Sequence, residues 1–159
     1  GLGDVYKRQV AQREEALANQ LAEMRTRKRK LVDPLQYEMS IQAQDLAGYV
    51  PAFGWECSPP TDKQKAKLEK LGIFPDEIQS AGKAKLILDR LEKRRIEGLT
   101  TPKQIRMLES RGFQHVGKWQ FDEASALISR IAANGWRTPK NINPKTYVPQ
   151  SEVNTVGLT

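Results

Sequence analysis

The chain has 159 residues, of which 38% are hydrophobic and 28% are charged, a composition typical of one ordinary soluble domain or a pair of very small ones. No segment approaches the roughly 20 apolar residues that a membrane helix needs, and no signal peptide opens the chain. The single cysteine, Cys57, excludes an internal disulfide, so we expect a reducing, cytoplasmic setting without a membrane partner. The net charge of +7 favours polyanionic partners such as nucleic acid and is equally compatible with simple solubility.

Residues 1–9, GLGDVYKRQ, resemble a translated sequencing adaptor and include no initiator Met. We therefore expect the chain to be a fragment, and we predict its fold without this segment. The segment contributes two cations and one acidic residue, so the basic excess persists without it.

Residues 10–32 are predicted to form a long helix. Its apolar residues recur at spacings of four, three and seven: Leu17, Leu21, Met24 and Leu31. This stripe is too narrow to form a core by itself. Pairing of the helix with the same helix of a second copy of the chain is therefore an open alternative. The end of the helix is strongly basic and includes Arg27, Lys28, Arg29 and Lys30. Cations suit the negative end of the helix dipole there, and a phosphate-contacting patch is the alternative.

A second helix is predicted to begin at Pro34, because Asp33 can cap it and Gln36 lies three residues after that cap. We expect it to run to about Ala47 and to bury Leu35, Met39 and Leu46. Residues 48–60 contain three prolines, two glycines and three aromatic residues. This composition predicts an extended linker whose aromatic side chains dock on the following repeats or on a missing neighbour.

The rest of the chain is dominated by an ungapped internal repeat with an offset of forty residues. The recurring residues of the first copy are Thr61, Lys63, Gln64, Leu68, Glu69, Gly72, Ala84 and Arg90, and those of the second are Thr101, Lys103, Gln104, Leu108, Glu109, Gly112, Ala124 and Arg130. We assign residues 61–98 and 99–137 to the two copies. Residues 138–159 are predicted to be an extended tail that is disordered past Gln150.

Each copy is predicted to fold as helix, loop, helix. Thr61 and Thr101 open the first helices with capping boxes, and Gly72 and Gly112 follow where a left-handed residue ends a helix. The second helices bury residues at helical spacing: Ala84, Ile87, Leu88 and Leu91 in one copy, and Ala124, Leu127, Ile128 and Ile131 in the other. The predicted fold is therefore all-α, with a long N-terminal helix followed by two tandem helix-loop-helix repeats that share a core.

Several motifs imitate catalytic sites and lack an essential part. Residues 112–119, GFQHVGKW, resemble a phosphate-binding loop, but Trp119 stands where magnesium needs a hydroxyl, and a helix rather than a strand precedes the loop. Asp122 and Glu123 fit the first turn of a helix better than a metal site. His115 is the only histidine and suits a loop position, and Cys57 has no nearby histidine in the sequence. We therefore expect no catalytic residue, metal site or cofactor in this chain.

The candidate phosphate contacts of the repeats are the duplicated cations Lys63, Lys103, Arg90 and Arg130. Lys63 and Lys103 lie in the first turns of their helices, where free backbone N–H groups can meet an anion; the alternative is that both are ordinary exposed lysines. No aromatic ladder recurs at the repeat spacing, so we expect weak, salt-dependent binding without sequence preference.

Six short segments stand out along the chain: DPLQYEMSI at 33–41, FGWE at 53–56, the two Thr-x-Lys-Gln repeats, IAANGW at 131–136 and YVP at 147–149. Together they resemble the C-terminal region of phage- and mobile-element-type superfamily II DEAD/DEAH-box helicases over about residues 10–150. The resemblance implies a non-catalytic accessory fragment that contacts nucleic acid or its own motor domains. ATP and magnesium would belong to those domains, upstream of this chain. The alternative is a free-standing nucleic-acid-binding or protein-interaction module built from the same repeat.

Overall fold

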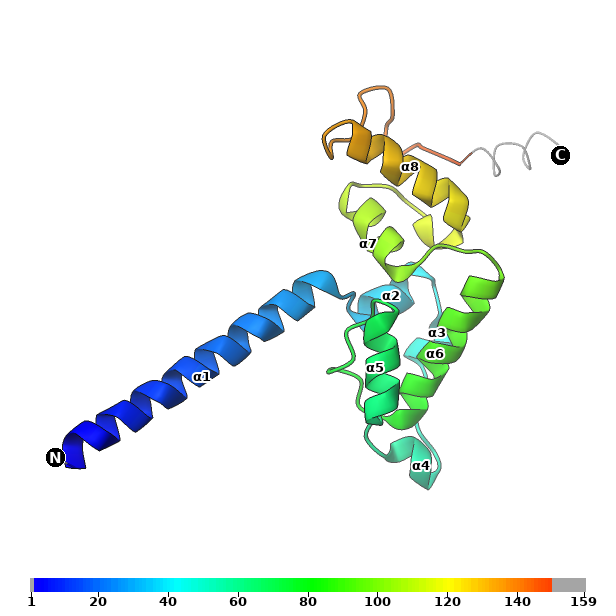
Figure 1. Ribbon diagram of the computed structural model, residues 1–159. Helices are drawn as coiled ribbons and strands as arrows, with labels where there is room; N and C mark the ends of the chain where they lie inside the picture. Colours follow the sequence, from blue (N-terminus) through cyan, green and yellow to red (C-terminus); the bar gives the residue numbers. More distant parts are fainter. Residues whose placement is uncertain (1, 150–159) are drawn as a thin grey trace.

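A computed structural model describes residues 2–149 and is all-helical over that range (Figure 1). The predicted fold class is confirmed. The two backbone bridges among the described residues, Val32 with Ile73 and Leu99 with Gln120, are isolated and build no sheet.

Helix α1 (Leu2–Lys30) projects from the body of the molecule as a single rod (Figure 1) and has no buried residue. The predicted start near residue 10 is wrong, because Leu2 to Lys30 contains no proline to interrupt a helix. The helix ends before Leu31 and Val32, which are buried. The Val32 N–H donates to the Gly72 carbonyl at 2.7 Å and the Val32 carbonyl accepts from Phe74 at 2.8 Å, so the chain leaves the helix to join the core.

The predicted second helix is split into α2 (Pro34–Ser40) and α3 (Gln44–Ala47), with Gln42 in the left-handed region between them. Burial of Leu46 is confirmed. Burial of Leu35 and Met39 is wrong, since their side chains are 58% and 65% exposed.

The inward face of α2 carries Tyr37 and Glu38 in place of those two residues. The buried Glu38 carboxylate lies 2.9 Å from Lys83 Nζ of α6, and the same ammonium group donates to the Leu46 carbonyl. A polar residue occupies this inward position because its charge has a partner there.

Residues 48–60 are not wholly extended, because the Phe53 carbonyl accepts from Glu56 and Cys57 and closes the short helix α4 (Gly54–Cys57). Tyr49 docks against α6, where its hydroxyl occupies the space beside Gly82, and it donates to Glu56 at 2.9 Å. Phe53 and Trp55 remain exposed. One of the three aromatic residues thus docks on the repeats, and docking of the other two on a missing neighbour stays a prediction.

Two helical pairs make up the body: α5 (Asp62–Lys70) with α6 (Ala81–Ile96), and α7 (Pro102–Ser110) with α8 (Phe121–Ala133), the latter pair joined through the 3₁₀ turn η1 (Val116–Lys118). Both predicted capping boxes form. Gly72 and Gly112 adopt φ values of +94° and +93°, which confirms the predicted left-handed helix ends.

Hydrogen bonds between the helices of a pair recur at the forty-residue offset. The Gln64 side chain donates to the Ala81 carbonyl at 3.1 Å, and the Gln104 side chain donates to the Phe121 carbonyl at 3.3 Å. The N–H groups of the same two acceptor residues donate to the carbonyls of Ser58 and Gly98. Equivalent sequence positions therefore make equivalent contacts.

One hydrophobic core spans both pairs and includes the predicted residues Ala84, Ile87, Leu91, Ala124, Leu127 and Ile131. Leu88 and Ile128 are half-buried at its edge. The described part of the tail has no helix, but it is anchored: the Tyr147 ring lies 5.5 Å from Phe113 and 5.6 Å from Trp119, centroid to centroid. The tail past Gln150, which was predicted to be disordered, lies outside the described residues.

Candidate nucleic-acid interface

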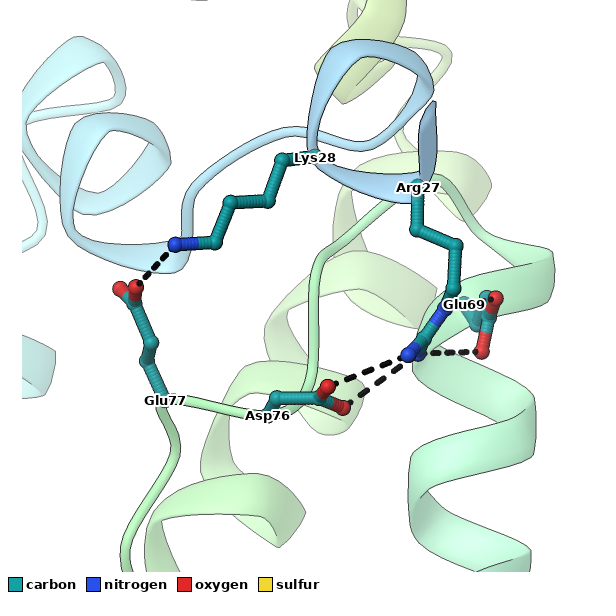
Figure 2. A network of polar contacts seen from close by, with 5 residues as sticks. All are labelled: Arg27, Lys28, Glu69, Asp76 and Glu77. Carbon is teal, nitrogen blue, oxygen red and sulfur yellow. Dashed lines mark hydrogen bonds and ion pairs between the residues drawn. The ribbon is translucent and has the colours of Figure 1, made fainter. Parts of the chain in front are cut away.

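Two of the four predicted cations at the end of α1 are neutralised by the first helical pair (Figure 2). Arg27 lies between Glu69 and Asp76, with N–O distances of 3.1 Å to each, and Lys28 lies 3.5 Å from Glu77. The hydrogen bonds to Glu69 and Asp76 raise the pKa of the Arg27 guanidinium above its ordinary value. These two side chains therefore fasten α1 to the body.

Arg29 and Lys30 are exposed, as is Lys28, but neither of them forms an ion pair within residues 2–149. The helix end beside them is already capped. Arg106 of α7 donates to the Leu31 carbonyl at 2.7 Å, which satisfies one of the acceptors that a helix end leaves free. The predicted phosphate patch is thus reduced to two available charges.

The duplicated cations of the repeats have different surroundings. Arg90 of α6 forms an ion pair with Asp45 at 2.5 Å, whereas Arg130 of α8 is exposed and forms no ion pair with any described residue. Lys103 lies with its aliphatic stem over Gly72, at the C-terminal end of α5. Lys63 lies in the first turn of the same nine-residue helix, roughly 12 Å away along its axis. The four residues therefore do not form one cluster.

The capping boxes occupy much of the backbone that the predicted anion sites require. At the start of α7 the N–H groups of Thr101 and Gln104 are both bonded within the box, and Pro102 has no N–H. Only the Lys103 N–H is left in that first turn. An uncapped helix N-terminus presents several free N–H donors to an anion, whereas this one presents a single donor.

A different basic segment lies at the end of α8 and in the chain after it, and the sequence prediction included only one of its cations, Arg130. From Ala124 to Pro149 the chain contains no acidic residue. Its four cations are all exposed and form no ion pair within the described part of the chain: Arg130, Arg137, Lys140 and Lys145. A search for long acid-free runs in the sequence would have found this segment.

Trp136 presents an aromatic face within this segment. Its side chain is 58% exposed and its φ is +62°, a region that bulky residues rarely adopt. The conformation is held by the Trp136 N–H, which donates to the Ile131 carbonyl at 2.9 Å, and by the Asn134 amide, which donates to the Arg137 carbonyl at 2.9 Å. Local strain that keeps an aromatic ring in solvent is typical of binding positions.

The segment that resembles a phosphate-binding loop is used for packing. Trp119 is buried and meets Phe113 edge-to-face, with centroids 5.9 Å apart. A Cβ added to Gly117 would lie 2.5 Å from the Ser40 carbonyl oxygen, so this glycine permits close approach of α2. His115 is exposed in the left-handed region and opens η1.

Asp122 and Glu123 lie in the first turn of α8, as predicted. Among the described residues no group of three or more His, Cys, Asp or Glu side chains is placed to hold a metal ion. None of the helices in the described range is both long and apolar enough to cross a membrane.

The comparisons with known proteins returned no matching family model, no matching curated protein and no matching solved structure.

Proposed function

We propose that this chain is a non-catalytic nucleic-acid-binding piece that contacts the phosphate backbone through the end of α8 and residues 134–149. The observation that carries the proposal is the acid-free run from Ala124 to Pro149, with its four exposed cations, none of which forms an ion pair with a described residue. Unpaired surface cations are available to release counterions from a polyanion, whereas cations held in ion pairs are not.

The resemblance to the C-terminal region of superfamily II helicases supplies the wider context. In that context the chain is an accessory fragment that holds nucleic acid close to motor domains encoded upstream. ATP and magnesium would be bound there. The exposed residues Lys63, Lys103, Arg29 and Lys30 are separate, secondary contacts in this proposal.

The test compares two variants with the same change in net charge. Arg137→Gln/Lys140→Gln removes two unpaired cations, and Lys85→Gln/Arg95→Gln removes two that are paired with Asp89 and Glu92. Fluorescence anisotropy with a labelled single-stranded oligonucleotide, over a salt series, measures the slope of log affinity against log salt concentration. We expect the first variant to lower the slope by about 1.4 units, at about 0.7 per phosphate contact on single strands. Equal slopes in the two variants would refute the proposed surface.

A second test uses Trp136 and compares binding to single-stranded nucleic acid with binding to duplex. An exposed ring stacks on unpaired bases and contributes on the order of 1–3 kcal/mol for each base. Trp136→Asn removes the ring, and Asn tolerates the left-handed backbone better than Trp, so folding should be preserved. We expect about tenfold weaker binding to single strands and little change on duplex. Equal losses on both forms would assign Trp136 a structural role.

A second candidate function is supported by the exposed apolar residues Val50, Phe53 and Trp55 around α4, which fit a protein partner such as the motor domains. Phe53→Ser/Trp55→Ser should leave oligonucleotide binding unchanged and weaken binding to motor domains encoded upstream. Unchanged binding to those domains would remove this candidate.

A further inference from the structure

The exposed face of α5 carries a row of lysines that is separate from the basic segment at the end of the chain. Lys63, Lys67 and Lys70 recur at spacings of four and three, so they share one face of the helix over roughly 10 Å of its axis. Just past the helix, the aliphatic stem of Lys103 lies over Gly72 and brings a fourth cation to this end. All four lysines are exposed, and none forms an ion pair within residues 2–149. We call them the α5 lysine row.

The acidic residues of α5 do not pair with this row. Asp62 and Glu69 lie roughly 100° or more around the helix axis from the middle of the row. Glu69 is held by Arg27 at 3.1 Å, and Asp62 forms no ion pair with a described residue. The lysines of the row thus outnumber the one acid of their helix that is not neutralised.

One acid of the neighbouring helix lies near the row. The pKa of Glu92 on α6 is lowered mainly by a hydrogen bond from Arg95 and, as the smallest of the causes, by the charge of Lys67. The two hydrogen bonds from Arg95 to Glu92 measure 2.7 and 3.1 Å. Because Glu92 is already paired with Arg95, it leaves Lys67 available to an added anion.

The second repeat lacks the middle of this row. The forty-residue offset places Met107 and Ser110 of α7 at the positions of Lys67 and Lys70. Met107 packs against the core, and the Ser110 hydroxyl donates to the Met107 carbonyl at 2.6 Å. The row therefore belongs to the first copy, in which this face of the helix is in solvent, and duplication of the repeat does not account for it.

This face of α5 offers charge without apolar surface. The one large apolar residue of the helix, Leu68, is buried, and the small Ala66 lies between the lysines. A protein partner needs an apolar centre to its interface, whereas a phosphate backbone is bound through charge and counterion release. The helix has no aromatic residue on which an unpaired base could stack. The chemistry of the face thus fits the backbone of a nucleic acid and does not depend on unpaired bases.

We propose that the α5 lysine row is a second nucleic-acid surface, which contacts the phosphate backbone alone and binds duplex and single strands alike. The inference rests on the proposed function for its class of partner, and it adds a surface with a different preference. The segment after α8 combines cations with the exposed ring of Trp136, whereas the row supplies cations only. Removal of either surface therefore leaves the other in place.

The test uses the whole chain and fluorescence anisotropy over a salt series, with labelled duplex and single-stranded oligonucleotides of one length. Lys67→Gln and Lys70→Gln are made singly and together. The matched control is Lys85→Gln, which removes one exposed helical lysine that is held by Asp89 at 2.9 Å. We expect each single row variant to lower the slope of log affinity against log salt concentration by about 0.9 units on duplex and about 0.7 on single strands. The double variant should lose about twice as much, and Lys85→Gln should keep the parent slopes.

Two results would overturn the proposal directly. One is a double variant that keeps the parent slopes on both forms, and the other is a loss confined to single strands, which would contradict a contact to the backbone alone. Lys67→Arg/Lys70→Arg keeps both charges and should keep the parent slopes. A loss in this variant as large as in the glutamine variant would assign the effect to a change in α5 itself and not to charge.

Combination with Arg137→Gln/Lys140→Gln separates this inference from the proposed function. If both surfaces bind, the losses in slope add in the fourfold variant, because the two surfaces share no residue. A loss in the Arg137/Lys140 variant alone keeps the proposed function and overturns the row as a binding surface. A loss in the Lys67/Lys70 variant alone keeps the row and overturns the surface after α8.

Polyglutamate tests the alternative of an acidic protein partner. We expect it to bind more weakly than duplex, because an extended chain places its charges about 3.5 Å apart and duplex DNA places them about 1.7 Å apart along its axis. Binding of polyglutamate as tight as that of duplex, and lost in Lys67→Gln/Lys70→Gln, would assign the row to acidic proteins and overturn the proposal.

Discussion

Gly117→Ala tests whether the segment that resembles a phosphate-binding loop is a packing element. The added Cβ would lie 2.5 Å from the Ser40 carbonyl oxygen and 3.3 Å from the Ile41 Cα. Both neighbours are backbone atoms, so either η1 or the end of α2 must move. Overpacking of this kind costs about 1–3 kcal/mol.

The same shift disturbs Arg94, because the Gly117 carbonyl accepts from its Nη2 at 2.8 Å. Weakening a hydrogen bond to a buried charge adds about 1 kcal/mol or more. We therefore expect a total loss of about 2–4 kcal/mol, a large share of the stability of an ordinary domain. Urea denaturation followed by circular dichroism should show a midpoint lowered by about 1–2 M with an unchanged slope.

Gly54→Ala is the control, because a Cβ at that position meets nothing within 4 Å, and its midpoint should match the parent chain. Nucleotide binding by both variants is measured alongside. If Gly117→Ala is as stable as the control but loses binding of ATP that the parent chain shows, the segment is a phosphate-binding loop and the packing argument fails.

Thr61→Ala and Thr101→Ala should each lower the free energy of unfolding by about 1 kcal/mol, because each removes one half of a capping box; equal stability to the parent in urea denaturation would count against this. Hydrogen bonds from the Ala52 N–H and, to a smaller extent, from the Tyr49 hydroxyl lower the pKa of Glu56. The ionised carboxylate therefore stabilises the fold above the unfolded-state pKa, and this contribution is lost as the pH falls through the folded-state pKa. Glu56→Gln should therefore lose less stability than the parent between pH 6 and pH 3, and parallel curves would contradict the assignment. A shortened chain beginning at residue 25 should keep the parent melting temperature, because α1 buries no side chain, and a marked drop would show that α1 packs on something in solution.

The sequence by itself determined the local features of this protein. Capping boxes, the left-handed glycines and the buried faces of α6 and α8 depend on residues within one or two helical turns of each other, so their pattern can be read without knowing the fold. The exposed stripe on α1 belongs to the same class, since Leu17 and Leu21 follow helical spacing and stay in solvent.

Only the tertiary structure decided which side chains are available for a partner. Arg27 is neutralised by residues 42 and 49 positions away, and Arg90 differs from its repeat equivalent Arg130 because Asp45 arrives from α3. Tyr37 and Glu38 took the place of the expected residues because Tyr37 packs in the shared hydrophobic core and Lys83 of α6 pairs with Glu38 on that face of α2. Charged side chains interact through space, and the partners of Arg27 and Arg90 are distant in the sequence. Whether a cation is paired decides whether it is available to a polyanion. That pairing depends on the packing of the helices, which no local sequence pattern encodes.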